Sequence, residues 1–296
     1  MKRSRILILT TCIICILTIQ SVSAQEKKKD STNFSLQFDY LSNYLYNGRA
    51  DSLKSPYQIT TASITFANGV YSNLSAYYLL TPSQHRFDFF ELNVGYNYTL
   101  SKKISGQIYG SKYFYSGQTN LFNSDITSNI GSSFNIDLGG IQFNNEVDIF
   151  FSNKADVQYT PGFEKTFSVE VSHEKNWSFS PTIYAEISST NYYESSISRR
   201  SLRGPKQPVA SGLTSITTLN NKGMKLLDLN FSIPINFESK NILFSLTPTY
   251  LMPFNKVSLT TINKTPTSTS SFDATPYAEN NLTSQLYFQI GLGYKF

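Results

Sequence analysis

Apolar and polar residues alternate along almost the whole chain, from residue 34 to the last residue. Segments of about ten residues repeat this period of two, which is typical of β-strands whose two faces meet different surroundings. No stretch shows the three- to four-residue spacing of an amphipathic helix. The pattern predicts twelve strands, at residues 34–46, 57–66, 70–80, 90–100, 104–115, 126–136, 141–151, 157–171, 177–192, 227–237, 242–252 and 283–296.

The connections between these segments alternate in length. Every second connection is a tight turn, at 68–69, 101–103, 137–140, 173–176 and 238–241, and Asn68-Gly69 is a strong hairpin dipeptide. The other connections tend to be longer, at 47–56, 81–86, 116–125, 152–156, 193–223 and 253–282. Short turns at one end and long loops at the other are typical of transmembrane β-barrels. We therefore predict one all-β domain at 34–296, a closed antiparallel up-and-down barrel of about twelve strands with both termini on the short-turn side.

Aromatic residues gather at both ends of the predicted strands, as the two interfacial girdles of a membrane barrel require. The group near the long loops is Tyr44, Tyr57, Tyr78, Phe90, Tyr115, Phe151, Tyr159, Tyr192 and Tyr250. The group near the short turns is Phe34, Phe66, Tyr98, Phe134, Phe143, Phe167, Trp177, Phe237 and Phe296. A soluble β-sandwich or a β-solenoid is the alternative, but neither predicts turns and loops that alternate in length.

Four prolines inside predicted strands argue against a regular closed barrel, which has no free edge to hold them: Pro161, Pro181, Pro234 and Pro248. Each is expected at a bulge or near a rim. Lys165 also falls on the apolar phase of its strand, and a bulge at Pro161 would turn this side chain inward.

The residues opposite the apolar phase are polar, and we expect them to line a lumen. Its candidate acidic residues are Asp39, Glu91, Glu146, Asp148, Glu164, Glu186 and Asp228. Lys295 and Lys165 are expected to offset part of this negative charge. Acidic walls lower the barrier for cations and raise it for anions. The alternative is that basic side chains from the loops pair with these acids and leave a plugged or purely structural barrel.

The N-terminus has the organisation of a cleavable signal peptide at 1–24. Lys2, Arg3 and Arg5 precede the apolar run 6–19, and Ser23-Ala24 predicts cleavage before Gln25, leaving a short periplasmic tail at 25–33. A signal anchor is the alternative, although the apolar run is short for a membrane span. Cys12 and Cys15 leave with the peptide, so disulfides and thiol chemistry are excluded from the mature chain.

Composition and charge exclude several other classes of protein. Of 296 residues, 15% are charged, 15% are aromatic and 40% are hydrophobic, with a mean hydropathy of −0.24. These values exclude a helical membrane bundle and argue against disorder. The whole chain has 25 basic and 20 acidic residues, a formal charge of +5. Removal of the signal peptide takes away three basic residues and leaves 22 against 20, or about +2. We therefore expect no nucleic-acid partner.

The last segment, Gln-Leu-Tyr-Phe-Gln-Ile-Gly-Leu-Gly-Tyr-Lys-Phe at 285–296, alternates to a terminal aromatic residue. It resembles the C-terminal signal strand of Gram-negative outer-membrane proteins. The resemblance implies that Tyr294 and Phe296 belong to an assembly signal, that the outer-membrane assembly machinery is a partner, and that the membrane contains lipopolysaccharide. Gln25 after a Ser-Ala site is similar to mature N-termini of the Bacteroidota.

A narrower resemblance rests on Ser-Asn-Tyr-Leu-Tyr-Asn-Gly at 42–48 and Gly-Val-Tyr-Ser-Asn at 69–73. These segments resemble the first hairpins of TorF-like porins. That family usually carries Arg-Gly where this chain has Asn47-Gly48-Arg49, and the match covers about 60 residues.

Catalytic and metal-binding patterns are missing from the sequence. His173 lies in a predicted turn, and His85 lies near Ser83 and Asp88 without the spacing of a known catalytic motif. We expect no catalytic residues, no metal and no cofactor, and therefore no enzyme. A basic loop contains Arg199, Arg200, Arg203 and Lys206, which either bind lipopolysaccharide phosphates or are simply solvated.

The sequence thus favours a passive outer-membrane channel or porin for small polar solutes or ions. The alternatives are a structural or adhesive barrel that acts through its long extracellular loops and, with less support, a lipid-modifying enzyme centred on His85. The Ser/Thr tract at 260–271 is expected to be disordered or to fold over the barrel mouth.

Overall fold

A computed structural model describes residues 32–46, 49–50, 55–81, 84–117, 119, 121, 123–172, 175–191, 214–220, 223–254, 258–264, 268–273 and 282–296. The predicted signal peptide, most of the tail, His173 and the basic loop lie outside these residues. No helix among the described residues is long and apolar enough to cross a membrane.

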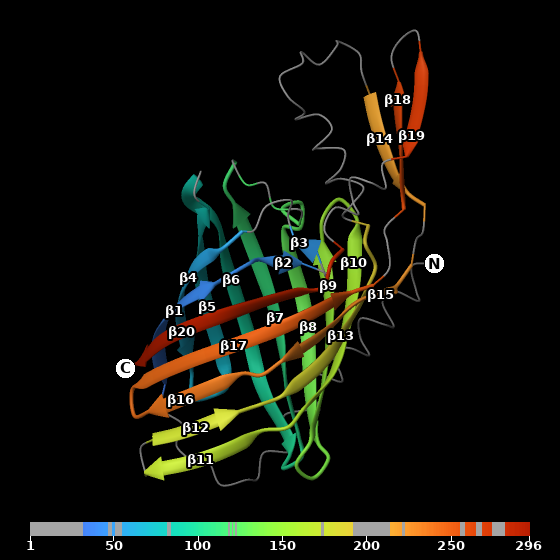
Figure 1. The fold of residues 1–296 in the computed structure, drawn as a ribbon. Coiled ribbons are helices and arrows are strands. Elements are labelled where there is room, and N and C mark those ends of the chain that lie inside the picture. Colours follow the sequence, from blue (N-terminus) through green and yellow to red (C-terminus); the bar gives the residue numbers. More distant parts are fainter. Residues whose placement is uncertain are drawn as a thin grey trace, which may run out of the picture. The chain divides into compact units, whose positions relative to one another are not determined.

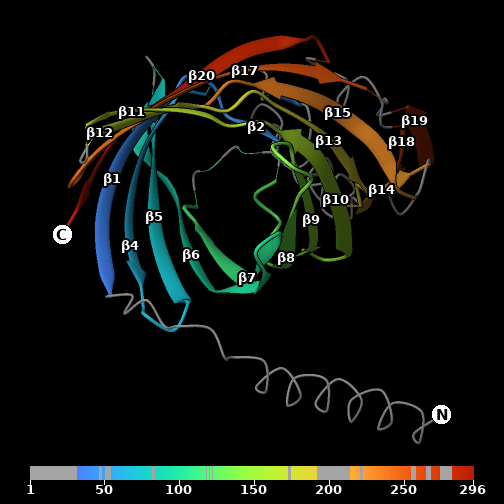
Figure 2. The same cartoon turned by 90° about the horizontal axis from the view of Figure 1, so that it is seen from below.

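The alternating segments form a closed antiparallel barrel of twelve strands (Figures 1 and 2). Nine barrel strands are continuous: β1 (Asn33–Leu41), β4 (Tyr57–Thr65), β5 (Val70–Thr81), β6 (Gln84–Ser101), β7 (Ile104–Tyr115), β8 (Ser128–Asp137), β9 (Gln142–Phe151), β17 (Ile242–Pro253) and β20 (Gln285–Lys295). Three are interrupted: β10 (Ala155–Glu164) with β11 (Phe167–Ser172), β12 (Lys175–Phe179) with β13 (Thr182–Ser188), and β15 (Lys225–Ser232) with β16 (Ile235–Ser239). The predicted fold class is therefore confirmed.

The last strand closes the ring by pairing with the first. β20 pairs with β1 from Ser35↔Lys295 to Leu41↔Gln289, and on its other side with β17. Figure 2 shows the barrel along its axis, with β20 between β1 and β17. Closure satisfies the backbone hydrogen bonds at this seam, which a barrel in lipid requires.

The outer face carries the apolar phase that the alternation predicts. In β20, Leu286 is 76% exposed and Leu292 is 56% exposed, while the residues between the outward positions are more buried. Large apolar side chains are similarly exposed on the other barrel strands, including Phe38, Leu74, Val94, Ile108, Ile130 and Phe163. An exposed apolar surface that runs around a closed barrel is the face that meets lipid.

The short connections that the structure describes in full are tight turns. Gly69 takes a φ of +90°, and its amide donates to the Phe66 carbonyl at 2.9 Å. At the turn after β8, the amides of Gly139 and Gly140 both donate to Asp137 Oδ1, at 2.8 and 3.1 Å. Gly139 and Gly140 both have positive φ. Glycine adopts this conformation without the strain that a residue with a side chain would have.

Pro181 and Pro234 lie where strands are interrupted, whereas Pro161 and Pro248 lie inside continuous strands. None of the four shifts the strand register, which corrects the predicted bulge at Pro161. Pro161 lies opposite Asn145 in an unbroken β9–β10 ladder, and the register of Phe163↔Ile183 continues as Phe167↔Phe179. Lys165 therefore stays on the outer face, where its Nζ lies 5.1 Å from the centre of the Phe167 ring. The expectation that Lys165 offsets charge in the lumen is wrong.

Segments of the long connections form two smaller sheets. β14 (Thr214–Leu219), β18 (Leu259–Lys264) and β19 (Thr269–Asp273) make a three-stranded antiparallel sheet, and β2 (Leu45–Tyr46) pairs with β3 (Arg49–Ala50). The Ser/Thr tract at 260–271 is thus largely strand. Its β18 joins the two longest connections by pairing from Thr214↔Lys264 to Leu219↔Leu259.

Candidate lumen site

The inner wall from mid-strand to the short turns is polar, and its main feature is a pair of carboxylates near the middle of β9. The Tyr109 hydroxyl of β7 lies within hydrogen-bond reach of both, contacting Glu146 closely and Asp148 Oδ1 at 2.9 Å. Asn129 Nδ2 donates a further bond to Asp148 Oδ1 at 2.7 Å. Because a hydroxyl carries one proton for two carboxylates, most of their lone pairs remain for another donor or a cation.

Gly131 makes the approach of Tyr109 to these carboxylates possible. It lies opposite Tyr109 in the β7–β8 ladder. A Cβ at this position would lie 2.3 Å from Asp148 Oδ1 and 2.4 Å from Tyr109 Cζ. Because Gly131 has no side chain, the Tyr109 ring can pass over β8 and reach the carboxylates of β9.

A cavity of about 500 Å³ lies beside this pair, lined by β7, β8, β9, β10 and β13. Glu146, Asp148 and Glu186 are its acidic lining residues, and no Lys or Arg of the described chain lines it. The remaining lining is mostly amide and hydroxyl side chains, including Gln107, Asn144, Gln158 and Thr160. The cavity is thus a polar space with negative charge on one side.

Two further candidate acids meet on the next strands. Glu186 and Asp228 lie directly opposite each other in the β13–β15 ladder, beside a register shift between Glu186 and Ile187. Asp228 is fully buried and accepts a hydrogen bond from Asn230. The sequence-predicted residues Glu146, Asp148, Glu186 and Asp228 therefore lie on one wall, on β9, β13 and β15, with β10 between β9 and β13.

The other three candidate acids lie apart from this group. Asp39 is buried on β1 and accepts a bond from Gln37 Nε2 at 2.9 Å. Glu164 accepts a bond from Thr166 Oγ1 at 3.0 Å beside the interruption between β10 and β11. Glu91 lies near the long-loop end, 3.3 Å from the Tyr77 hydroxyl.

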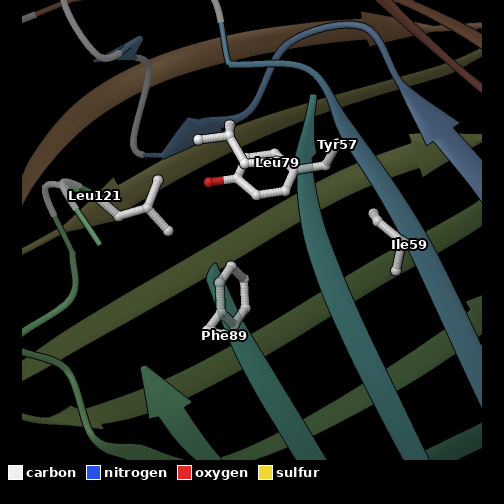
Figure 3. Packing of buried hydrophobic residues seen from close by; sticks show 5 residues of the cluster. All are labelled: Tyr57, Ile59, Leu79, Phe89 and Leu121. Atoms are coloured by element: carbon white, nitrogen blue, oxygen red, sulfur yellow. The ribbon is translucent and has the colours of Figure 1, made fainter. Parts of the chain in front are cut away.

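The inner wall near the long loops is aromatic and apolar, which the sequence interpretation missed. Figure 3 shows Tyr57 and Ile59 of β4, Leu79 of β5 and Phe89 of β6 converging with Leu121. Leu121 belongs to the connection after β7 and is 3% exposed, so part of this connection lies inside the barrel. Packed against the cluster are Leu41, Tyr44, Tyr77, Tyr113 and Tyr115.

Hydrogen bonds and ring contacts fix this inserted connection. Asn123 Nδ2 donates to the Tyr44 hydroxyl at 3.0 Å, and Tyr44 packs edge-on against Tyr57 at 5.6 Å. Tyr44, Tyr57 and Tyr115 were predicted in the outer girdle; they lie at that end of the barrel but face its interior. The missed signal is that residues 77–80 and 113–115 are apolar or aromatic on both phases.

The region around His85 does not form a catalytic constellation. His85 is exposed on β6, whereas Asp88 is 1% exposed and contacts the Tyr57 hydroxyl and Arg86 Nε, the latter at 3.2 Å. In the described part of the chain, no group of three or more His, Cys, Asp or Glu side chains is arranged to hold a metal ion.

A closed up-and-down barrel with an apolar outer face and a polar inner wall defines a transmembrane β-barrel of the outer-membrane type. No family model matches the sequence, and no curated protein matches it. The fold is similar to several solved structures at very low sequence identity.

The NanC porin, solved in a rhombohedral crystal form, shares 10% identity over 89% of this chain and 100% of that chain, with a TM-score of 0.46. OmpF of Salmonella typhi, in complex with daunomycin, shares 6% identity over 90% and 97%, with a TM-score of 0.30. The outer membrane protease OmpT of Escherichia coli shares 9% identity over 93% and 100%, with a TM-score of 0.31.

Proposed function

We propose that this protein is a passive channel of a bacterial outer membrane that passes small polar solutes or ions and prefers cations. The observation that carries the proposal is the cavity of about 500 Å³, in which the charged lining residues among those the structure describes, Glu146, Asp148 and Glu186, are all acidic. Fixed negative charge on a pore wall attracts cations and repels anions. Asp228 adds a further acidic side chain opposite Glu186, and Asp39 adds one on β1, apart from this group.

The aromatic cluster near the long loops acts in this proposal as the narrow part of the pathway. Leu121 and the side chains around it occupy the interior at that end. Apolar constrictions restrict ion flow because water leaves them readily. We therefore expect a small conductance that depends on the connection between β7 and β8.

The test is the conductance of the purified protein in a planar bilayer with different KCl concentrations on the two sides. We expect a reversal potential that shows cation preference. The double variant Glu146→Gln with Asp148→Asn should move that potential toward zero because it removes two charges from the cavity. Asp137→Asn is the matched control, since Asp137 lies in the exposed turn after β8 and does not line the cavity.

Anion preference would contradict the proposal. Absence of conductance steps in both the wild-type protein and a variant with an opened constriction would also contradict it.

We further infer the route to the membrane from the predicted signal peptide at 1–24 and the C-terminal strand. Tyr294 and Phe296 are exposed, and the Phe296 ring packs against Phe34 at 5.2 Å, which is the seam that an assembly machinery must close. Removing Phe296 should lower the amount of barrel in the outer membrane. The basic residues Arg199, Arg200, Arg203 and Lys206 remain a proposed contact for lipopolysaccharide phosphates.

A second candidate function is adhesion through the long connections, favoured by the sheet of β14, β18 and β19. A sheet made from two separate connections presents a defined surface, unlike a flexible loop. Deletion of 193–223 should abolish binding to a surface ligand and leave conductance unchanged if this function is correct. Lost conductance with no binding phenotype would favour the channel alone.

A further inference from the structure

A second, smaller cavity lies in the interior near the long loops. Its volume is about 100 Å³, and its lining includes five tyrosines, two phenylalanines and one acidic residue, Glu91. The rings come from distant parts of the chain: Tyr77 from β5, Tyr113 and Tyr115 from β7, and Phe150 from β9. The cavity is therefore a box of aromatic side chains with one carboxylate in its wall.

Glu91 has no basic partner in the described part of the chain. Its side-chain hydrogen-bond partners are two neutral hydroxyls, those of Tyr77 at 3.3 Å and of Ser111, and no Lys, Arg or His among the described residues lines the cavity. A carboxylate among aromatic rings is costly without a counter-charge. The cavity thus has the charge that a bound cation would balance.

The aromatic walls are held in place by their own packing. Tyr77 stacks on Phe89 with ring centres 3.9 Å apart, and Phe89 packs against Tyr115 at 5.3 Å. On the far side, Tyr46 meets Phe150 edge-on at 6.2 Å. Because these rings are already ordered, a ligand would lose little free energy in arranging them.

The size and lining of the cavity select the kind of cation. Its volume corresponds to about three water molecules in the liquid, which suits a small head group and not a sugar ring or a nucleotide. A bare Ca²⁺ or Mg²⁺ ion needs six or more oxygen ligands, whereas the wall here is mainly ring surface. Quaternary ammonium groups bind among aromatic rings through cation–π attraction.

We propose that this cavity binds the head group of a quaternary ammonium compound, with Glu91 as its counter-charge and the tyrosine rings as its walls. The site is separate from the acidic cavity that carries the proposed channel. Binding here does not require conduction, so each proposal can fail without the other.

The test is calorimetric titration of the folded full-length protein in a non-ionic detergent that has no choline head group. The two probes are choline and 3,3-dimethylbutan-1-ol, a neutral molecule of the same shape. We expect saturable binding of choline and at least about tenfold weaker binding of the alcohol, because only choline carries the charge. Equal affinity for the two probes, or no saturable choline binding, would overturn the proposal.

Two variants locate the site, and a third serves as the control. Glu91→Gln should weaken choline binding about tenfold, whereas Tyr77→Phe, which keeps the ring, should retain it. Glu238→Gln, at the opposite end of the barrel, should bind choline as the wild type does. If Glu91→Gln fails to fold, the double variant Glu146→Gln with Asp148→Asn decides the question, because it changes only the acidic cavity and should leave choline binding unchanged; lost choline binding in that variant would overturn the proposal. Unchanged choline affinity in a folded Glu91→Gln protein would show that the cavity is not the site.

Discussion

The two halves of the barrel interior are built from different chemistry although the same strands form both. From mid-strand to the short turns, the wall is a network of amides, hydroxyls and carboxylates around Glu146 and Asp148. Near the long loops, the same inward positions hold Tyr57, Ile59 and Phe89, which enclose an inserted connection. Inward direction alone therefore does not make a residue polar.

The difference shows what each half contributes to the molecule. Carboxylates that share one tyrosine hydroxyl repel one another. This repulsion lowers the stability of the polar half, which gains a charged wall. Buried apolar side chains contribute roughly 1.5–3 kcal/mol each, so the aromatic half can hold the β7–β8 connection in the interior. We interpret the first half as the selective part of the pathway and the second as the narrow part.

The largest expected effect comes from breaking the aromatic half at Leu121. Leu121→Asp would place a charge in a cluster that is mainly apolar and aromatic, and because burial of a charge there is costly, the connection should leave the interior. Single-channel conductance should rise several-fold, with little change in ion preference because the acidic cavity is intact. Leu121→Met is the matched control, since it nearly preserves volume and should conduct like the wild type.

An unchanged conductance in Leu121→Asp would show that the constriction lies elsewhere. A change in ion preference of the same variant would show that the two halves are not separate in function.

A pair of tyrosine variants compares the two halves directly through the free energy of unfolding. We expect a smaller effect than in the Leu121→Asp variant. Tyr109→Phe removes the hydroxyl that contacts Glu146 and Asp148, and hydrogen bonds to charged groups contribute about 1.5–3 kcal/mol. Tyr115→Phe removes only a bond of 3.4 Å to the Asn123 carbonyl, so its cost should be about 0.5 kcal/mol. The measurement is the free energy of unfolding in guanidinium chloride; equal losses in both variants would contradict the comparison.

The strand pattern was predictable because lipid imposes one simple rule on the outer face. All twelve predicted segments contain barrel strands, and the outward residues of β20 are those of the apolar phase. The short turns were predictable for a similar reason, since Gly69, Gly139 and Gly140 take backbone angles that favour glycine.

The interior was less predictable because no single rule governs it. Strand 104–115 has an ambiguous phase since Tyr109, Tyr113 and Tyr115 face inward while Ile108 and Phe114 face lipid. A tyrosine suits either side, because its ring is apolar and its hydroxyl needs a partner. The position of Lys165 was also mispredicted, since a proline can leave a ladder hydrogen bond unmade without shifting the register.

The smallest expected effect concerns the turn that ends the polar half. Asp137→Ala removes the acceptor of the Gly139 and Gly140 amides, but both amides are exposed and can bond to water instead. The guanidinium midpoint of unfolding should therefore fall slightly, and conductance and ion preference should not change because Asp137 does not line the cavity. Asp137→Asn, which keeps an acceptor oxygen, should recover most of the midpoint. A clear change in ion preference in Asp137→Ala would mean that charge at the turn, and not only the wall around Glu146, sets the selectivity of the polar half.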